Sequence, residues 1–120
     1  MAKIREVMST GLHYVTPTMT VGEAVAIMAQ HRVGSVLVME GAQLVGIFTE
    51  RDTVRSLSHS HDAPAHAVSS WMTPEPMTVT PDSSTDDALK TMLDHNFRHL
   101  PVMEGAEVVG IVSIRDLAAI

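Results

Sequence analysis

The sequence contains no cysteine, no long apolar run and few aromatic residues. The absence of cysteine rules out a disulfide framework and favours a reducing compartment such as the cytoplasm. No apolar stretch approaches the roughly 20 residues that span a bilayer. The opening residues, MAKIREVM, also lack the apolar segment of a signal peptide. We therefore expect a soluble, cytoplasmic protein.

Positive charge is scarce as well. Eight Lys and Arg residues stand against fourteen Asp and Glu residues, and the formal net charge at pH 7 is -6. Broad binding to nucleic acids or to anionic membranes depends on clustered basic residues, and the eight in this chain are scattered. We expect neither a nucleic-acid partner nor a membrane partner.

The apolar residues that are present are mostly aliphatic. Hydrophobic residues make up 45% of the chain and aromatic residues 3%, so the core must consist of Val, Ile, Leu, Ala and the nine Met residues. Each half of the chain, about 60 residues, would bury too little apolar surface to be stable by itself. We therefore expect the two halves to share one core.

A seven-residue pattern occurs twice. GIFTERD, at residues 46–52, returns sixty-four positions later as GIVSIRD, at residues 110–116. At the same offset VMEGA, at residues 38–42, returns unchanged at residues 102–106, and no gap is needed between these matches. Self-similarity at one fixed offset indicates a tandem duplication.

The repeat boundaries follow from this alignment. We assign residues 1–58 to the first repeat with its N-terminal lead-in, residues 59–67 to a polar surface linker, and residues 68–120 to the second repeat. In both repeats the residues before the first strand, around Ile4 and Val68, are expected to form helical turns that pack on the core.

Each repeat is predicted to have the order strand, helix, strand, strand, helix. Apolar residues at helical spacing, β-branched runs and an EGA turn between the last two strands support this order. The predicted strands are 13–15, 35–39 and 44–49, then 77–79, 99–103 and 108–113. The predicted helices are 20–31, 50–58, 84–95 and 114–120. Thr20 with Glu23 and Ser84 with Asp87 predict a capping box at two of the helix starts.

The repeated pattern places a hydroxyl residue and an aspartate at a strand-to-helix turn. These residues are Thr49 and Asp52 in the first repeat and Ser113 and Asp116 in the second. Ser/Thr-x-x-Asp at a helix start is an N-cap arrangement, which satisfies free N–H groups. Alternatively, the turn can present donors to an anion while the aspartate accepts hydrogen bonds from two ribose hydroxyls. The spacing alone leaves both interpretations open.

Two glycines in the pattern have a similar ambiguity. Gly46 and Gly110 precede the hydroxyl residues by three positions. A glycine at this place either lets a ligand approach the backbone closely or serves strand packing.

The duplicated unit, with VTP at its start, SVLVMEG or HLPVMEG in its middle and GI-x-T/S-x-R-D at its end, resembles a tandem pair of cystathionine-β-synthase (CBS) domains, a Bateman module. The resemblance covers essentially the whole chain. It implies an α/β fold with small sheets flanked by helices, and two repeats packed about a pseudo-twofold axis with two clefts between them. It further implies that Gly-x-x-Thr/Ser-x-x-Asp contacts the ribose and phosphate of an adenosine-containing ligand.

The resemblance also implies which residues line each cleft. One cleft would combine Ile47, Thr49 and Asp52 with Val79, Thr80, Arg98 and His99. The other would combine Ile111, Ser113 and Asp116 with Val15, Thr16, Gly34 and Ser35. Because a guanidinium suits phosphate, we expect the Asp52 cleft to prefer phosphorylated ligands. The alternatives are a solvated surface charge for Arg98 and a polar strand residue for His99.

The function implied is that of a regulatory sensor for AMP, ADP, ATP, NAD or S-adenosylmethionine, acting as a homodimer. An alternative is a protein–protein interaction module with unoccupied clefts. We expect no enzymatic activity, no metal and no cofactor other than such a ligand. The linker residues His59, His61, Asp62 and His66 could offer metal ligands, but they lack the rigid spacing of a metal site.

Overall fold

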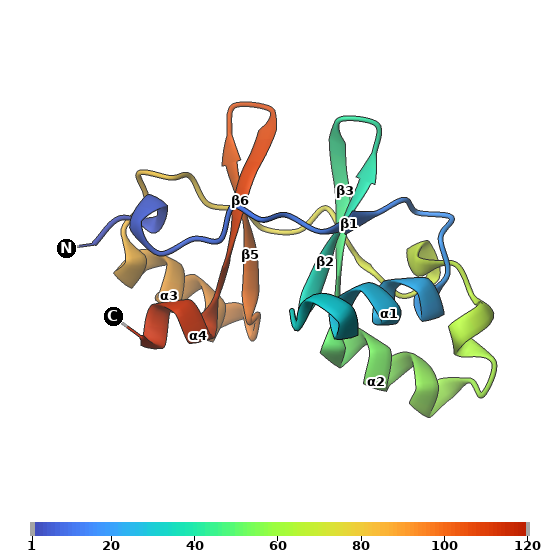
Figure 1. Ribbon diagram of the computed structural model, residues 1–120. Helices are drawn as coiled ribbons and strands as arrows, with labels where there is room; N and C mark the ends of the chain where they lie inside the picture. Colours follow the sequence, from blue (N-terminus) through green and yellow to red (C-terminus); the bar gives the residue numbers. More distant parts are fainter. Residues whose placement is uncertain (1, 120) are drawn as a thin grey trace. The chain divides into compact units, whose positions relative to one another are not determined.

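The computed structural model describes residues 2–119, and the chain divides into two compact units. The central unit is His13–Pro76. The terminal unit combines the residues up to Leu12 with those from Met77 onward. Both units are mixed α/β, with helices beside a small sheet (Figure 1). This confirms the predicted fold class.

The central unit contains a four-stranded sheet in the order β1-β2-β3-β4. Strands β1 and β2 are parallel, whereas β2–β3 and β3–β4 are antiparallel. The elements are β1 (Tyr14–Val15), α1 (Val21–His31), β2 (Ser35–Glu40), β3 (Gln43–Thr49), α2 (Glu50–His59), the 3₁₀ turns η2 (Ala63–Ala65) and η3 (Val68–Ser70), and β4 (Thr73–Pro74). The predicted order of strand, helix, strand, strand, helix is confirmed.

The terminal unit repeats the helix, strand, strand and helix of this pattern, and its sheet has two strands. Its elements are η1 (Ile4–Glu6), α3 (Thr85–His95), β5 (His99–Glu104), β6 (Glu107–Ser113) and α4 (Ile114–Ala118). The prediction of a strand at 77–79 was wrong, since Val79 contributes an isolated parallel bridge to Val102 and residues 77 and 78 pair with no strand. The last helix was expected to reach residue 120, which lies outside the described residues.

The ends of the elements follow from local sequence. Thr20 caps α1 and exchanges hydrogen bonds with Glu23, which confirms the first capping box. At α3 Ser84 also caps the helix, but its hydroxyl accepts the hydrogen bond from the N–H of Asp86, so the capping box predicted with Asp87 was wrong. The turns between the paired strands contain Gly41 and Gly105, each with a φ close to +60°, a conformation that glycine adopts without strain.

The buried apolar residues form two clusters, not the single shared core that we expected. One cluster lies in the central unit and the other in the terminal unit. The central cluster consists of Val15, Val21, Ala24, Met28, Val36, Val38, Phe48 and Val68. The terminal cluster consists of Ile4, Ala88, Met92, Leu100, Val102, Val112 and Leu117. The prediction of one core was wrong because each half buries additional apolar residues that come from the other half.

That surface comes from exchanged lead-ins. Ile4, from the lead-in of the first repeat, is fully buried in the terminal unit, and Val68, from that of the second, is fully buried in the central unit. The N–H of Ile4 donates to Ser83, and the N–H of Val68 donates to Met19. Figure 1 shows η1, in blue, beside the start of α3. The lead-ins form helical turns as predicted, but each packs on the other half of the duplication.

The edge of each sheet is completed in the same way. Strand β4, which contains Thr73, pairs antiparallel with β3 at Ile47. In the terminal unit Ser9 forms the equivalent antiparallel bridge to Ile111. The repeats 1–58 and 68–120 therefore describe the duplication of the sequence. Each packed unit instead combines the strands and helices of one repeat with the lead-in of the other.

Ion pairs attach the N-terminal lead-in to the terminal unit. Arg5 donates from Nε and Nη2 to Oδ1 of Asp82, at 3.1 and 2.8 Å. The hydrogen bonds and charge of Arg5 lower the pKa of the Asp82 carboxyl. Both side chains are exposed, so this pair adds little to the stability that the burial of Ile4 provides.

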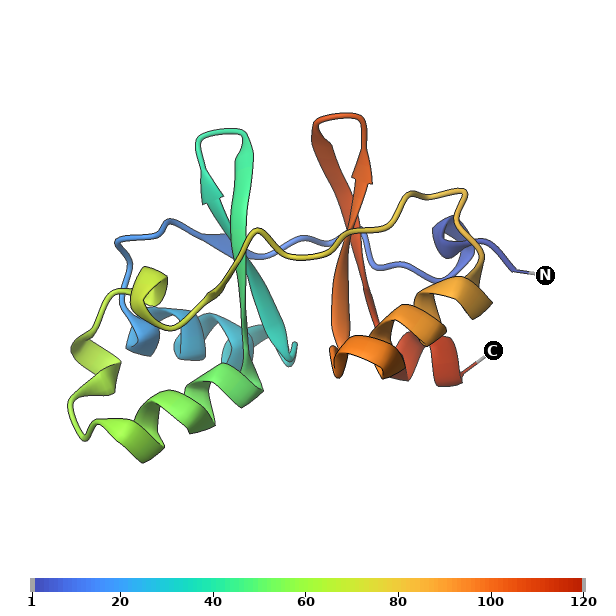
Figure 2. The same cartoon turned by 180° about the vertical axis from the view of Figure 1, so that it is seen from behind.

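Most residues of the segment predicted as a surface linker, 59–67, are exposed or half-buried, and the segment includes a 3₁₀ turn. It continues from α2 into η2, which packs against α1 and α2 (Figure 2). Ala63 is fully buried, and the backbone oxygen of His66 accepts the N–H of Val21. Among residues 2–119, no helix has both the length and the apolar character that crossing a membrane requires.

Candidate functional site

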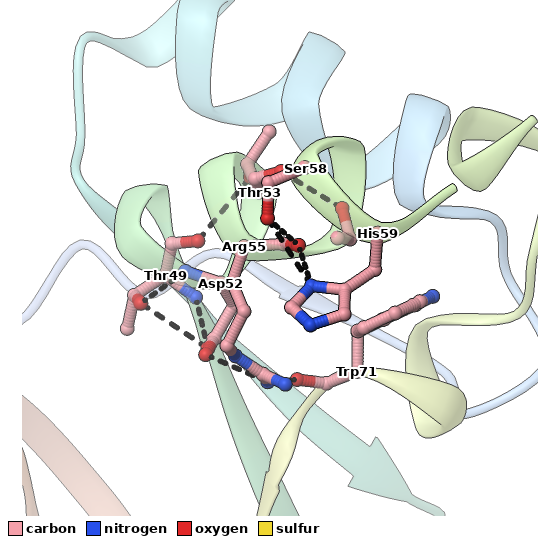
Figure 3. A network of polar contacts seen from close by, with 8 residues as sticks. Thr49, Asp52, Thr53, Arg55, Ser58, His59 and Trp71 are labelled. Carbon is pink, nitrogen blue, oxygen red and sulfur yellow. Dashed lines mark hydrogen bonds and ion pairs between the residues drawn. The ribbon is translucent and has the colours of Figure 1, made fainter. Parts of the chain in front are cut away.

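Thr49 and Asp52 form a closed pair at the start of α2 (Figure 3). The Thr49 N–H and hydroxyl donate to Oδ2 of Asp52 at 3.0 and 3.1 Å, and the N–H of Asp52 donates to Oγ1 of Thr49 at 3.2 Å. Asp52 is buried, with 7% of its surface exposed. The N-cap interpretation of the motif is therefore confirmed in the first repeat. The cap uses one carboxylate oxygen and leaves Oδ1 for other partners.

Arg55 takes up part of the hydrogen-bonding capacity of Oδ1 of Asp52. Its Nη2 lies 3.3 Å from Oδ1 of Asp52 and donates to the backbone oxygen of Trp71 at 2.7 Å. The guanidinium carbon also lies 5.4 Å from the centre of the Trp71 ring, within the range of a cation–π interaction. One side chain thus links the aspartate of the motif to the lead-in of the second repeat.

Ser113 and Asp116 form the equivalent cap at α4. The N–H of Ser113 donates to Oδ2 of Asp116 at 2.8 Å, and the N–H of Asp116 donates to Oγ of Ser113 at 3.1 Å. The position equivalent to Arg55 is Ala119, and the position equivalent to Trp71 is Val7. The two copies of the motif share the cap but differ in what surrounds it.

The first residues of β2 and β5 lie beside the motif. Ser35 pairs with Thr49 across β2 and β3, and His99 pairs with Ser113 across β5 and β6. Gly34, the residue before β2, is held at the start of α2, because its backbone oxygen accepts the N–H of Glu50 at 3.0 Å. A molecule bound at either hydroxyl would therefore also meet the start of the neighbouring strand.

The predicted site residues fall into both units. Val15, Thr16, Gly34, Ser35, Ile47, Thr49 and Asp52 belong to the central unit, and Val79, Thr80, Arg98, His99, Ile111, Ser113 and Asp116 belong to the terminal unit. Each predicted cleft draws on both groups, so the assignment of residues to clefts stays a prediction. Arg98 and Thr80 are exposed, and His99 is half-buried. The backbone oxygen of Arg98 accepts the N–H of Ile114 at 2.8 Å.

Arg55 and Trp71 were not predicted from the sequence. Arg55 follows Asp52 at a spacing of three residues, which places both on one face of a helix, and this was the only available signal. Nothing in the sequence indicates that Trp71 lies against α2. That contact depends on the exchanged lead-in.

A group of aromatic side chains surrounds Trp71. The indole N–H donates to Nδ1 of His66 at 3.1 Å, and the planes of the two rings are nearly parallel, with an angle of 4° between them. Nε2 of His66 lies 3.2 Å from Oδ1 of Asp62. Because Nδ1 accepts a hydrogen bond, the neutral tautomer of His66 carries its proton on Nε2. The ring of His59 also lies near Trp71, with ring centres 6.0 Å apart.

His59 and His66 are therefore both engaged with neighbouring side chains or backbone. His31 and His95 end α1 and α3, as predicted. Within the described part of the chain, no group of three or more His, Cys, Asp or Glu residues is arranged to hold a metal ion.

Known proteins resemble this chain over nearly its full length. A family model for the CBS domain matches residues 4–59 and 68–120. The CBS domain-containing protein YhcV of Bacillus subtilis (strain 168) is 35% identical over 119 residues, covering 98% of this chain and 84% of the relative. The CBS-domain containing protein ATU1752 from Agrobacterium tumefaciens has a TM-score of 0.94 at 29% identity, over 98% of both chains.

A further solved structure has a similar fold. It is the CBS domain pair of protein MJ0100 in complex with 5′-methylthioadenosine and S-adenosyl-L-methionine, with a TM-score of 0.90. The sequence identity is 23%, over 99% of this chain and 94% of that chain. At this level of identity the comparison concerns the fold alone.

Proposed function

The chain belongs to the CBS-domain family, and we propose that it is a regulatory sensor that binds an adenosine-containing ligand. The observation that carries the proposal is the duplicated pair of hydroxyl and aspartate, Thr49 with Asp52 and Ser113 with Asp116, at two helix starts. The CBS domain pair of MJ0100, which has the same fold, binds adenosyl ligands, and the proposal takes its class of ligand from this similarity in fold. The role is regulatory and not enzymatic, in a cytoplasmic setting.

The chemistry of the pair suits a nucleoside. A carboxylate accepts up to about four hydrogen bonds, and the N-cap leaves Oδ1 of each aspartate outside its own bonds. Two adjacent ribose hydroxyls are suitable donors to such an oxygen. The N-terminus of a helix also favours negative charge nearby, which accommodates the phosphate of a nucleotide.

In this proposal the ligand lies in a cleft between the two repeats. One ligand position uses Asp52 with Arg98 and His99, and the other uses Asp116 with Gly34 and Ser35. A ligand that contacts both repeats favours one relative arrangement of the repeats over another, and this shift of populations is the signal.

We propose a homodimer as the regulatory assembly. Helix α2 exposes Val54 and Leu57, which are 69% and 47% accessible, and closed twofold dimers are the commonest oligomers. Light scattering at micromolar concentration should give twice the chain mass of 13.0 kDa. A monomer mass under these conditions contradicts the assembly and leaves the ligand proposal intact.

Calorimetry with AMP, ADP, ATP, NAD and S-adenosylmethionine tests the ligand proposal. At least one of them should bind, and Asp52→Asn or Asp116→Asn should weaken binding while costing little stability, because the amide oxygen of asparagine can still accept the hydrogen bonds that the N-cap residue donates. A thermal shift provides a second readout, since a ligand specific for the native state raises stability. Binding that is unchanged in both variants contradicts the assignment of these aspartates.

A further inference from the structure

The hydrogen-bond capacity of Asp52 is almost used up within its own unit. Oδ2 accepts two bonds from Thr49, and Oδ1 accepts one from Arg55. Since a carboxylate offers about four acceptor positions, roughly one remains, on Oδ1. A ribose has two adjacent hydroxyl donors. It can donate both to Asp52 only if one of the present partners leaves.

Arg55 is the partner that can leave most easily. Its contact with Oδ1 is the longest of the three, at 3.3 Å, and its side chain is 49% exposed. The bonds from Thr49 belong to the N-cap of α2 and are tied to the helix start. A ligand that engages Asp52 fully therefore displaces Arg55 and preserves the cap.

Displacement of Arg55 changes the surroundings of Trp71. Nη2 of Arg55 donates to the backbone oxygen of Trp71 while its guanidinium lies by the indole ring. Trp71 precedes β4, the exchanged strand that completes the edge of the central sheet. It is the single tryptophan of the chain, so its emission reports on this contact without interference from other indoles.

The second copy of the motif lacks this connection. Ala119 and Val7 occupy the positions of Arg55 and Trp71, and neither side chain carries a hydrogen-bond donor. An Asp116→Asn substitution is therefore a control that alters the same motif without touching Arg55.

We propose that Arg55 acts as a latch, that is, it binds Oδ1 of Asp52 in the ligand-free chain and is displaced from it by an adenosyl ligand. The displacement of Arg55 is transmitted to Trp71 and the exchanged lead-in. Arg55 is thus a positioning residue that makes the two ligand positions unequal. This inference rests on the proposed function for the identity of the ligand, whereas the link from Asp52 through Arg55 to Trp71 is a property of the ligand-free chain.

The ligand-free link is tested by Trp71 emission. Asp52→Asn weakens the charge-assisted contact with Arg55 and should shift the emission, and Arg55→Met should shift it as well. In the Arg55→Met background, Asp52→Asn should have no further effect. Asp116→Asn should leave the emission unchanged. Unchanged emission in Asp52→Asn, or an equal shift in both backgrounds, overturns the link.

The displacement is tested by titration with AMP. In the unaltered protein Trp71 emission should change with the same dissociation constant that calorimetry gives. In Arg55→Met, AMP should bind about two- to fivefold more tightly, since an exposed ion pair no longer has to be broken, and the emission should no longer respond. Arg51→Met removes the same charge from the same helix and should not raise the affinity.

The outcomes separate this inference from the proposed function. Asp52-dependent binding of AMP without any change in Trp71 emission overturns the latch and leaves the proposed function in place. Weaker binding of AMP to Arg55→Met also overturns it, because Arg55 then assists the ligand. If AMP does not bind, the proposed function fails for this ligand, while the ligand-free comparison still decides whether Arg55 couples Asp52 to Trp71.

Discussion

The sulfur atom of Met72 lies 2.5 Å from the point at which a Cβ atom on Gly46 would stand, and Sδ of Met8 lies 2.7 Å from the same point on Gly110. Both methionines belong to the exchanged lead-ins, and both glycines belong to the repeated motif. Of the two roles considered for these glycines, strand packing is the one observed. Each glycine provides the space into which the lead-in of the other repeat inserts.

Gly46→Ala should destabilise the protein by about 1–3 kcal/mol, the usual cost of overpacking. The methionine side chain can move, but the added Cβ also meets the backbone oxygen of Thr73 at 3.0 Å, so β4 must shift. Urea denaturation measures the change. Gly11→Ala is the control, because nothing lies within 4 Å of its added Cβ. Equal stability of the two variants would contradict the insertion of Met72 against Gly46.

The exchange of lead-ins can be tested with a matched pair of core substitutions. Ile4→Ala should cost about 2–5 kcal/mol, as is typical for a buried isoleucine, and its effect on hydrogen exchange should appear in β5 and β6. Val68→Ala, at the equivalent position, should instead weaken protection in β2 and β3. If each substitution acted on its own repeat, the arrangement described for the two cores would be wrong.

His13 should make stability depend on pH. Its ring stacks on that of His31 with centres 4.0 Å apart, and burial, followed by the charge of His31, lowers the pKa of His13. The unfolded chain then binds more protons than the folded chain below about pH 6.5. This contribution to stability is complete above that pH and is lost as the pH falls.

Thermal denaturation between pH 7 and pH 5 checks this expectation. His31→Gln should reduce the loss of stability at the acidic end, because it removes the like charge. His95→Gln is the control, since His95 ends the equivalent helix and stacks on Phe97. Identical pH profiles for the unaltered protein and His31→Gln would show that the stacked pair does not contribute.

Arg98 should favour phosphorylated ligands. It is exposed, and its guanidinium can form a charge-assisted hydrogen bond to a phosphate. Arg98→Ala is expected to weaken AMP binding about ten- to a hundredfold and adenosine binding much less. Calorimetry with both ligands measures the difference. An equal loss for AMP and adenosine would show that Arg98 does not contact the phosphate.

The sequence by itself determined the helices, five of the six strands that it predicted, and their order, because these depend on neighbouring residues. The periodic apolar residues of α1, the cap formed by Thr20 and the glycine turn at Gly41 act over a few positions. The fixed offset between GIFTERD and GIVSIRD likewise identified the duplication and the paired motif. For the same reason, both Thr49 and Ser113 were found to cap a helix as that motif predicts.

The tertiary structure alone decided which segments complete each core. Ile4 and Val68 occupy equivalent positions in the repeats, so no local pattern distinguishes packing on the same half from packing on the other. The choice is made by contacts between residues far apart in the sequence, such as the N–H of Ile4 with Ser83. The neighbours of Asp52 follow from that choice, because Arg55 reaches Trp71 only when the second lead-in packs on the first repeat.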